Sequence, residues 1–180
     1  MGGVTISVEK PPLDFIFSVT TTSTPQSFYL PTVISGTYDY VVDWGDDSSD
    51  HIITYNDANR IHSYATPGNY DITISGTLNG WSFSSVTNSR LLVKDIKQWG
   101  IFNHGDVAGA FGGCKGLTAI TATDTINLTS NGNTLLSNFF YDCENMTTIS
   151  RINEWDVSNI NIFEFSLVFR ESSFKNFTSL

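Results

Sequence analysis

The chain has 180 residues, enough for one or two domains with a substantial hydrophobic core. Charged residues make up only 15% of it, against about 25% in an average soluble protein, and the net charge is −9 with nine Lys and Arg. Nucleic acid and anionic membranes are bound through clustered cations, so this composition excludes them as expected partners. No apolar run approaches the roughly eighteen residues of a membrane helix, and membrane insertion is not expected.

The first half of the chain shows the alternation of apolar and polar residues that is typical of strands. We expect residues 1–12 to be an N-terminal arm, because Pro11 and Pro12 cannot join a central strand. Short alternating runs then follow, separated by turn residues, and they predict a β-sandwich over residues 13–88. The clearest runs are Phe15–Val19, Tyr38–Trp44 and Tyr70–Ile74.

Two motifs within this half point to a known type of domain. The first is Asp43-Trp44-Gly45-Asp46-Asp47-Ser48, and the second runs from His62-Ser63-Tyr64 to Pro67-Gly68-Asn69-Tyr70. At these residues the chain resembles a polycystic-kidney-disease-type (PKD) immunoglobulin-like domain. It departs from the pattern at Asp47, where that family usually has Gly.

The second half, residues 89–180, contains a sequence repeat. Phe111-Gly112-Gly113-Cys114 recurs 29 residues later as Phe140-Tyr141-Asp142-Cys143, and again as Phe169-Arg170-Glu171-Ser172. A fixed period of this size predicts a stacked solenoid of about three units. The strands are expected to start at 117–120 and 146–149, and helical returns are expected over 135–140 and 163–169.

With these repeats and Trp155-Asp156-Val157-Ser158-Asn159, the whole chain is similar to BspA-type leucine-rich repeat surface proteins with a preceding PKD domain. The resemblance implies a fold that is mainly β with short helices, namely a PKD-like β-sandwich followed by a short leucine-rich-repeat solenoid. It also implies adhesion and protein-protein interaction. The chain departs from that family in its few units and in having no export signal.

Several residue clusters are candidates for a metal or catalytic site. Asp43, Asp46, Asp47 and Asp50 form an acidic loop that fits either turn formation, which we favour, or calcium binding. His51, His62 and His104 have no zinc-type spacing, and His62 is expected to be a structural hydrogen-bonding residue. No motif of a nucleophile elbow, phosphate loop or redox pair occurs, so we predict no catalytic, cofactor or metal site and no enzyme.

Other conspicuous residues are expected to have structural roles. Cys114 and Cys143 occupy equivalent repeat positions and are predicted to be small buried side chains, with a disulfide or a metal pair as alternatives. The tryptophans at 81, 99 and 155 are expected in the core, with sugar stacking as the alternative. Three Asn-x-Ser/Thr sequons are interpreted as ordinary loop or ladder positions: Asn127, Asn145 and Asn176.

The two ends of the chain suggest where it works. The last residues stay apolar at Phe174, Phe177 and Leu180, so a second copy, another protein or further residues are expected to cover the last repeat. The N-terminus lacks the pattern of a secretory signal, which favours assembly in a host cytoplasm. We therefore expect a phage virion protein: a capsid decoration, head-fibre or tail-associated component that contacts other virion proteins, a receptor or a glycan. The alternatives are a bacterial cell-surface adhesin and a carbohydrate-binding accessory of a glycan-active enzyme.

Overall fold

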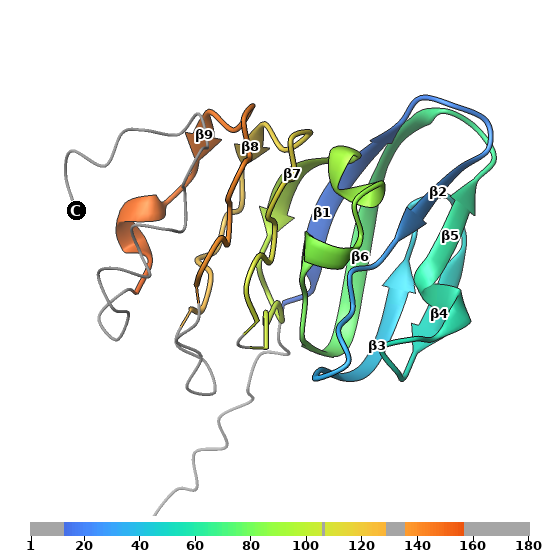
Figure 1. Ribbon diagram of the computed structural model, residues 1–180, viewed down its shortest axis with the longest axis horizontal. Helices are drawn as coiled ribbons and strands as arrows, with labels where there is room; N and C mark the ends of the chain where they lie inside the picture. Colours follow the sequence, from blue (N-terminus) through green and yellow to red (C-terminus); the bar gives the residue numbers. More distant parts are fainter. Residues whose placement is uncertain (1–12, 106, 129–135, 157–180) are drawn as a thin grey trace, which may run out of the picture.

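The computed structural model describes residues 13–105, 107–128 and 136–156, and these residues form two β-sheets joined by turns (Figure 1). The expected N-terminal arm, the third repeat copy at 169–172, the predicted return at 163–169 and the apolar end of the chain lie outside the described residues. The fold is mainly β with short helices, as the sequence predicts. No described helix has the length and apolar character needed to cross a membrane.

One sheet has seven strands in the order β4-β3-β6-β1-β7-β8-β9, and the other pairs β2 with β5. The strands are β1 (Phe15–Thr21), β2 (Gln26–Tyr29), β3 (Thr37–Asp43), β4 (Ser49–Ile52), β5 (Ile61–Tyr64), β6 (Gly68–Asn79), β7 (Val93–Gln98), β8 (Ala119–Ile120) and β9 (Thr148–Ile149). The described residues also include the one-turn 3-10 helices η1 (Ala58–Arg60), η2 (Phe83–Ser85), η3 (Ser89–Leu91) and η5 (Ile152–Glu154).

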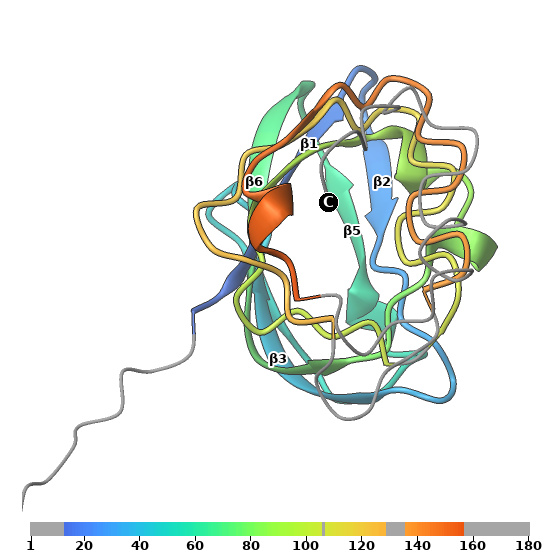
Figure 2. The ribbon, with the colours of Figure 1, turned by 90° about the vertical axis from the view of Figure 1, so that its left-hand side faces the viewer.

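The alternating runs form strands, as predicted. In β1 every second residue is buried, and β1 pairs antiparallel with β6 so that Phe17 lies opposite Ile72. The alternation of β3 likewise points its apolar side chains inward. The β2–β5 sheet lies across from the large sheet (Figure 2), and the ring of Phe28 packs 5.8 Å from that of Phe17. Side chains from both sheets therefore share one interior.

Beyond β7 the large sheet changes from antiparallel to parallel pairing. β7 runs antiparallel to β1, whereas β8 and β9 add in parallel. The 29-residue period appears here as strand register, because Ile120 pairs with Ile149. Thr118 N donates to Lys94 O and Thr147 N donates to Thr118 O, so the donors of these two bonds are also 29 residues apart.

The predicted leucine-rich-repeat solenoid is wrong. The described residues form a mixed sheet with almost no helix, and they do not form a solenoid. The sequence predicts a helical return at 135–140. Residues 136–140 of it are described, and 137–140 form turns instead of a helix. Asn138 has φ of +59°, and a left-handed residue ends helical hydrogen bonding. Between β6 and β7 the chain forms the short helices η2 and η3, and β7 begins at Val93.

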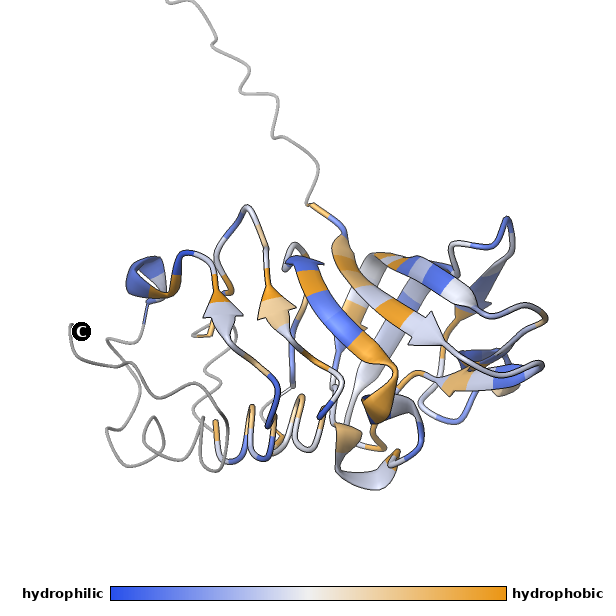
Figure 3. Cartoon of the chain, turned by 90° about the horizontal axis from the view of Figure 1, so that it is seen from above, coloured by the Kyte–Doolittle hydropathy of each residue, from blue (hydrophilic) through white to orange (hydrophobic). Residues whose placement is uncertain are grey.

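A single hydrophobic core extends through both halves of the described chain. Hydrophobic and hydrophilic residues alternate along the strands on its wall (Figure 3). The ring of Phe15 packs 5.5 Å from Trp81, the ring of Trp99 lies 6.0 Å from Phe111, and Phe111 stacks 5.6 Å from Phe140. Aromatic contacts thus connect β1 with the turns of both repeats.

Candidate functional site

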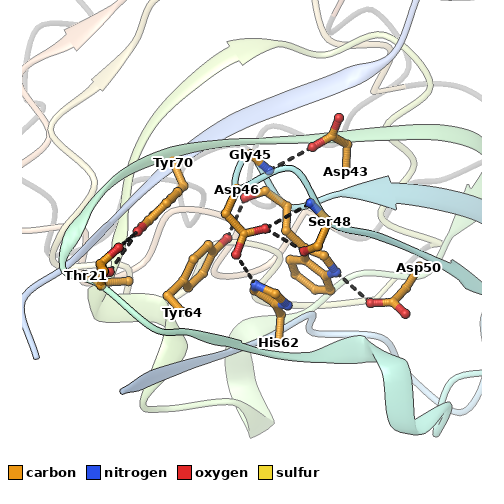
Figure 4. Close-up of polar contacts among 11 residues, drawn as sticks. Thr21, Asp43, Gly45, Asp46, Ser48, Asp50, His62, Tyr64 and Tyr70 are labelled. Carbon is orange, nitrogen blue, oxygen red and sulfur yellow. Dashed lines mark hydrogen bonds and ion pairs between the residues drawn. The ribbon is translucent and has the colours of Figure 1, made fainter. Parts of the chain in front are cut away.

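The acidic loop after β3 forms a closely bonded turn (Figure 4). Asp43 Oδ1 accepts a hydrogen bond from Gly45 N at 2.8 Å, and Asp46 Oδ1 accepts from Ser48 N at 3.3 Å. Asp50 Oδ2 accepts from the indole nitrogen of Trp44 at 2.9 Å. The carboxylates therefore satisfy the donors of the turn itself, which is the structural role favoured by the sequence.

His62 links this turn to β5. Its Nε2 lies 2.7 Å from Asp46 Oδ2, and its ring stacks on Trp44 with centroids 4.7 Å apart. Two residues further along β5, the hydroxyl of Tyr64 donates to the carbonyl of Trp44 at 2.9 Å and holds the same turn. His62 is thus the structural hydrogen-bonding residue that the sequence predicted.

The surroundings of Asp46 favour its ionised form. Partial burial raises the pKa of the carboxyl, but the hydrogen bonds from Ser48 and His62 and the charge of His62 outweigh it and bring the pKa below the ordinary value of 3.8. The Asp46 carboxylate therefore stabilises the turn through its hydrogen bonds with Ser48 and His62. Among the described residues, no group of three or more His, Cys, Asp or Glu is placed to hold a metal ion.

The remaining histidines and the tryptophans do not converge on a site. His51 lies on an exposed face, where its Nε2 is 2.8 Å from Asp39 Oδ1, whereas His104 is buried. Trp81, Trp99 and Trp155 are 0%, 1% and 6% exposed. These indoles belong to the core, and a sugar-stacking platform of tryptophans is ruled out by their burial.

The two cysteines are free and buried, as predicted. Burial raises the pKa of Cys143 to about 12 and raises that of Cys114 well above its ordinary value. Cys143 Sγ lies 3.2 Å from the carbonyl oxygen of Phe111 in the preceding repeat. Both thiols are protonated at neutral pH and are poor nucleophiles.

The sequons lie at different kinds of position. Asn145 donates from Nδ2 to the carbonyl of Lys115 at 2.7 Å, which places it in a ladder between repeats, as the sequence suggested. Asn127 lines a shallow hollow of about 450 Å³ at the end of β6, together with Thr37 and Asn79. Asn176 lies outside the described residues.

A smaller hollow of about 250 Å³ lies where η3 faces the turns of the two described repeats. Its lining includes Ser84 and Arg90 from the segment of η2 and η3, and Asn138, Tyr141 and Asp142 from the second repeat. Three glycines complete its lining: Gly109, Gly112 and Gly113. No sequence motif identified this hollow, because its polar members are dispersed over nearly sixty residues.

Comparison with known proteins gives no relative: no family model matches the chain, and neither a curated protein nor a solved structure matches it. The resemblance to BspA-type leucine-rich repeat proteins with a PKD-like domain is therefore not supported. Phe-x-x-Cys and Trp-Asp-Val-Ser-Asn are short patterns, and the described residues around the two Phe-x-x-Cys segments form no solenoid.

Proposed function

We propose that this chain is a non-enzymatic structural or adhesive module that displays a binding surface. We favour a role in a phage virion, as a capsid decoration, head-fibre or tail-associated protein. The alternative is an adhesin on a bacterial cell surface. The observation that carries the proposal is the continuous core, which joins β1 to the turns at Phe111 and Phe140. A block built around one close-packed core keeps its surface groups in fixed positions for a partner.

The finer architecture is part of this proposal. We infer that the β2–β5 sheet and the facing strands make residues 13–88 a β-sandwich. The described residues from 89 onward would then form a second unit that extends the large sheet through β7, β8 and β9. Such an extension enlarges one polar surface without a break in the backbone pairing.

The surroundings of the cysteines and of His62, whose side chains could in principle act in catalysis, support a non-enzymatic role. The raised pKa values of Cys114 and Cys143 disfavour the thiolate that a nucleophilic mechanism needs. His62 is engaged by Asp46 and stacked on Trp44, so its ring is fixed within the turn. The low content of charged residues leaves a surface of hydroxyl and amide groups, which suits contact with proteins or glycans.

A glycan array and a hydrolysis assay on the same full-length protein test this proposal. We expect retention of specific ligands without release of products. Turnover of any bound glycan would replace the proposal with an enzymatic function. A gene position among capsid and tail genes would favour the virion over the bacterial surface.

A further inference from the structure

Arg90 is a cation whose buried nitrogen has no partner. Its Nε–H is buried and has no hydrogen-bond partner in the described structure. The ion pairs found among the described residues use other cations, namely His51, His62, Lys97, Lys115 and Arg151. A guanidinium carries five donors, so Arg90 retains capacity for an external acceptor.

Glycine makes room for this guanidinium. A Cβ at Gly113 would lie 2.6 Å from both Cζ and Nη1 of Arg90, and a Cβ at Gly109 would lie 2.4 Å from Ser84 Oγ. Both glycines have positive φ, +74° and +72°. The guanidinium of Arg90 and the hydroxyl of Ser84 therefore pack directly against glycine backbone, at positions where any larger residue would displace them.

The 29-residue step brings an acceptor into the lining of the same hollow. Asp142 is the repeat equivalent of Gly113 and shares its left-handed backbone, with φ of +57°. Its carboxylate contacts Lys115 Nζ at 3.3 Å and is partly exposed, so it has further acceptor capacity. Asn138 and Tyr141 add an amide and a phenol at the same rim.

We propose that this space, the Arg90 hollow, binds a neutral sugar unit of a glycan. Neighbouring sugar hydroxyls both accept and donate hydrogen bonds, and here they meet a cationic donor in Arg90 and an anionic acceptor in Asp142. A volume of about 250 Å³ suits a unit of this size. The charges of Arg90 and Asp142 in the lining are opposite, which favours a ligand without net charge. The inference deepens the proposed function, on which it rests, by naming the class of ligand.

The test is ligand-observed NMR of the full chain with free glucose, galactose, mannose and N-acetylglucosamine, and with glucuronate and inorganic phosphate as anionic probes. We expect saturable binding of at least one neutral sugar. Arg90→Gln and Asp142→Asn should each weaken it at least about tenfold, the effect of losing one charge-assisted hydrogen bond. Lys97→Gln is the matched control, since it removes one positive charge on β7 at an exposed ion pair with Asp71.

Circular dichroism of each variant establishes that it is folded, and Asn at position 142 tolerates the left-handed conformation. The inference is overturned if no neutral sugar binds, if only the anions bind, or if folded Arg90→Gln and Asp142→Asn both bind as the unaltered chain does. The proposed function is judged separately, by retention on the array and by the absence of hydrolysis. A chain that is retained on the array, but whose binding is unchanged in folded Arg90→Gln and Asp142→Asn, would lose the Arg90 hollow as a site and keep its role as a binding module.

Discussion

Gly109 and Asn138 occupy the same position in successive repeats, and both adopt the left-handed backbone conformation, with φ of +72° and +59°. The backbone nitrogens of Gly109 and Phe111 donate to the carbonyls of Ser137 and Phe139, so the two turns are hydrogen-bonded in register. The sequence period is therefore a period of backbone conformation and not only of apolar side chains.

Gly109→Ala is expected to lower the free energy of unfolding by about 1–2 kcal/mol, because an L side chain is strained at this φ. Asn138→Gly is the matched change at the equivalent position and should alter stability little. Urea denaturation measures both. Equal stability of Gly109→Ala and the unaltered chain would show that residue 109 is not left-handed in solution.

Phe111→Ala should destabilise the whole described block by about 3–5 kcal/mol. Its ring is fully buried and contacts Trp99 and Phe140, so its loss opens a cavity between the large sheet and the second repeat. Denaturation followed by tryptophan fluorescence and by circular dichroism should give one coincident transition, because the core is continuous. Two separated transitions would mean that the halves unfold independently.

Asp46→Asn should remove part of the acid sensitivity of folding. The pKa of Asp46 is lowered in the folded state, so its ionised form stabilises the protein above the unfolded pKa, and this contribution is lost as the pH falls through the lower folded pKa. The variant should be less stable than the unaltered chain at pH 7 and should lose less on acidification below about pH 4. Denaturation at pH 7, 5, 4 and 3 measures the difference, with Asp71→Asn, at an exposed pair with Lys97, as control. Parallel curves for Asp46→Asn and the unaltered chain would contradict the lowered pKa.

Cys114 and Cys143 should resist a maleimide reagent at pH 8 in the native protein and react fully in denaturant. Both side chains are buried and both pKa values are raised, which suppresses the reactive thiolate. Mass spectrometry after timed labelling counts the modified thiols. Rapid native labelling would show that this part of the core opens readily.

The strands of the first half could be predicted because alternation has a direct physical cause. Phe15, Phe17 and Val19 all point to one face of β1, and that face is the core. The sequence also indicated the turn after Asp43 and a structural hydrogen-bonding role for His62, although it did not identify Asp46 as the partner of His62. In both cases the residues that carry the pattern are close in sequence or belong to short motifs.

The period of 29 residues was informative about register but misleading about shape. It correctly aligns Ile120 with Ile149, yet the segments between strands turn at left-handed residues instead of forming helices. A short apolar run such as Phe139-Phe140 is compatible with a buried turn as well as with a helix. The Arg90 hollow could not be predicted, because it depends on where η3 packs on the later turns.

The most direct test of the proposed role is imaging of the native assembly that contains this chain, by electron cryo-microscopy at a resolution that separates strands. The account predicts the two-sheet block at fixed, repeated positions on the surface of a virion or a cell envelope, in contact with neighbouring proteins and with part of its surface free for a ligand. Finding the chain packed over the active site of an enzyme, or free of any assembly, would contradict it.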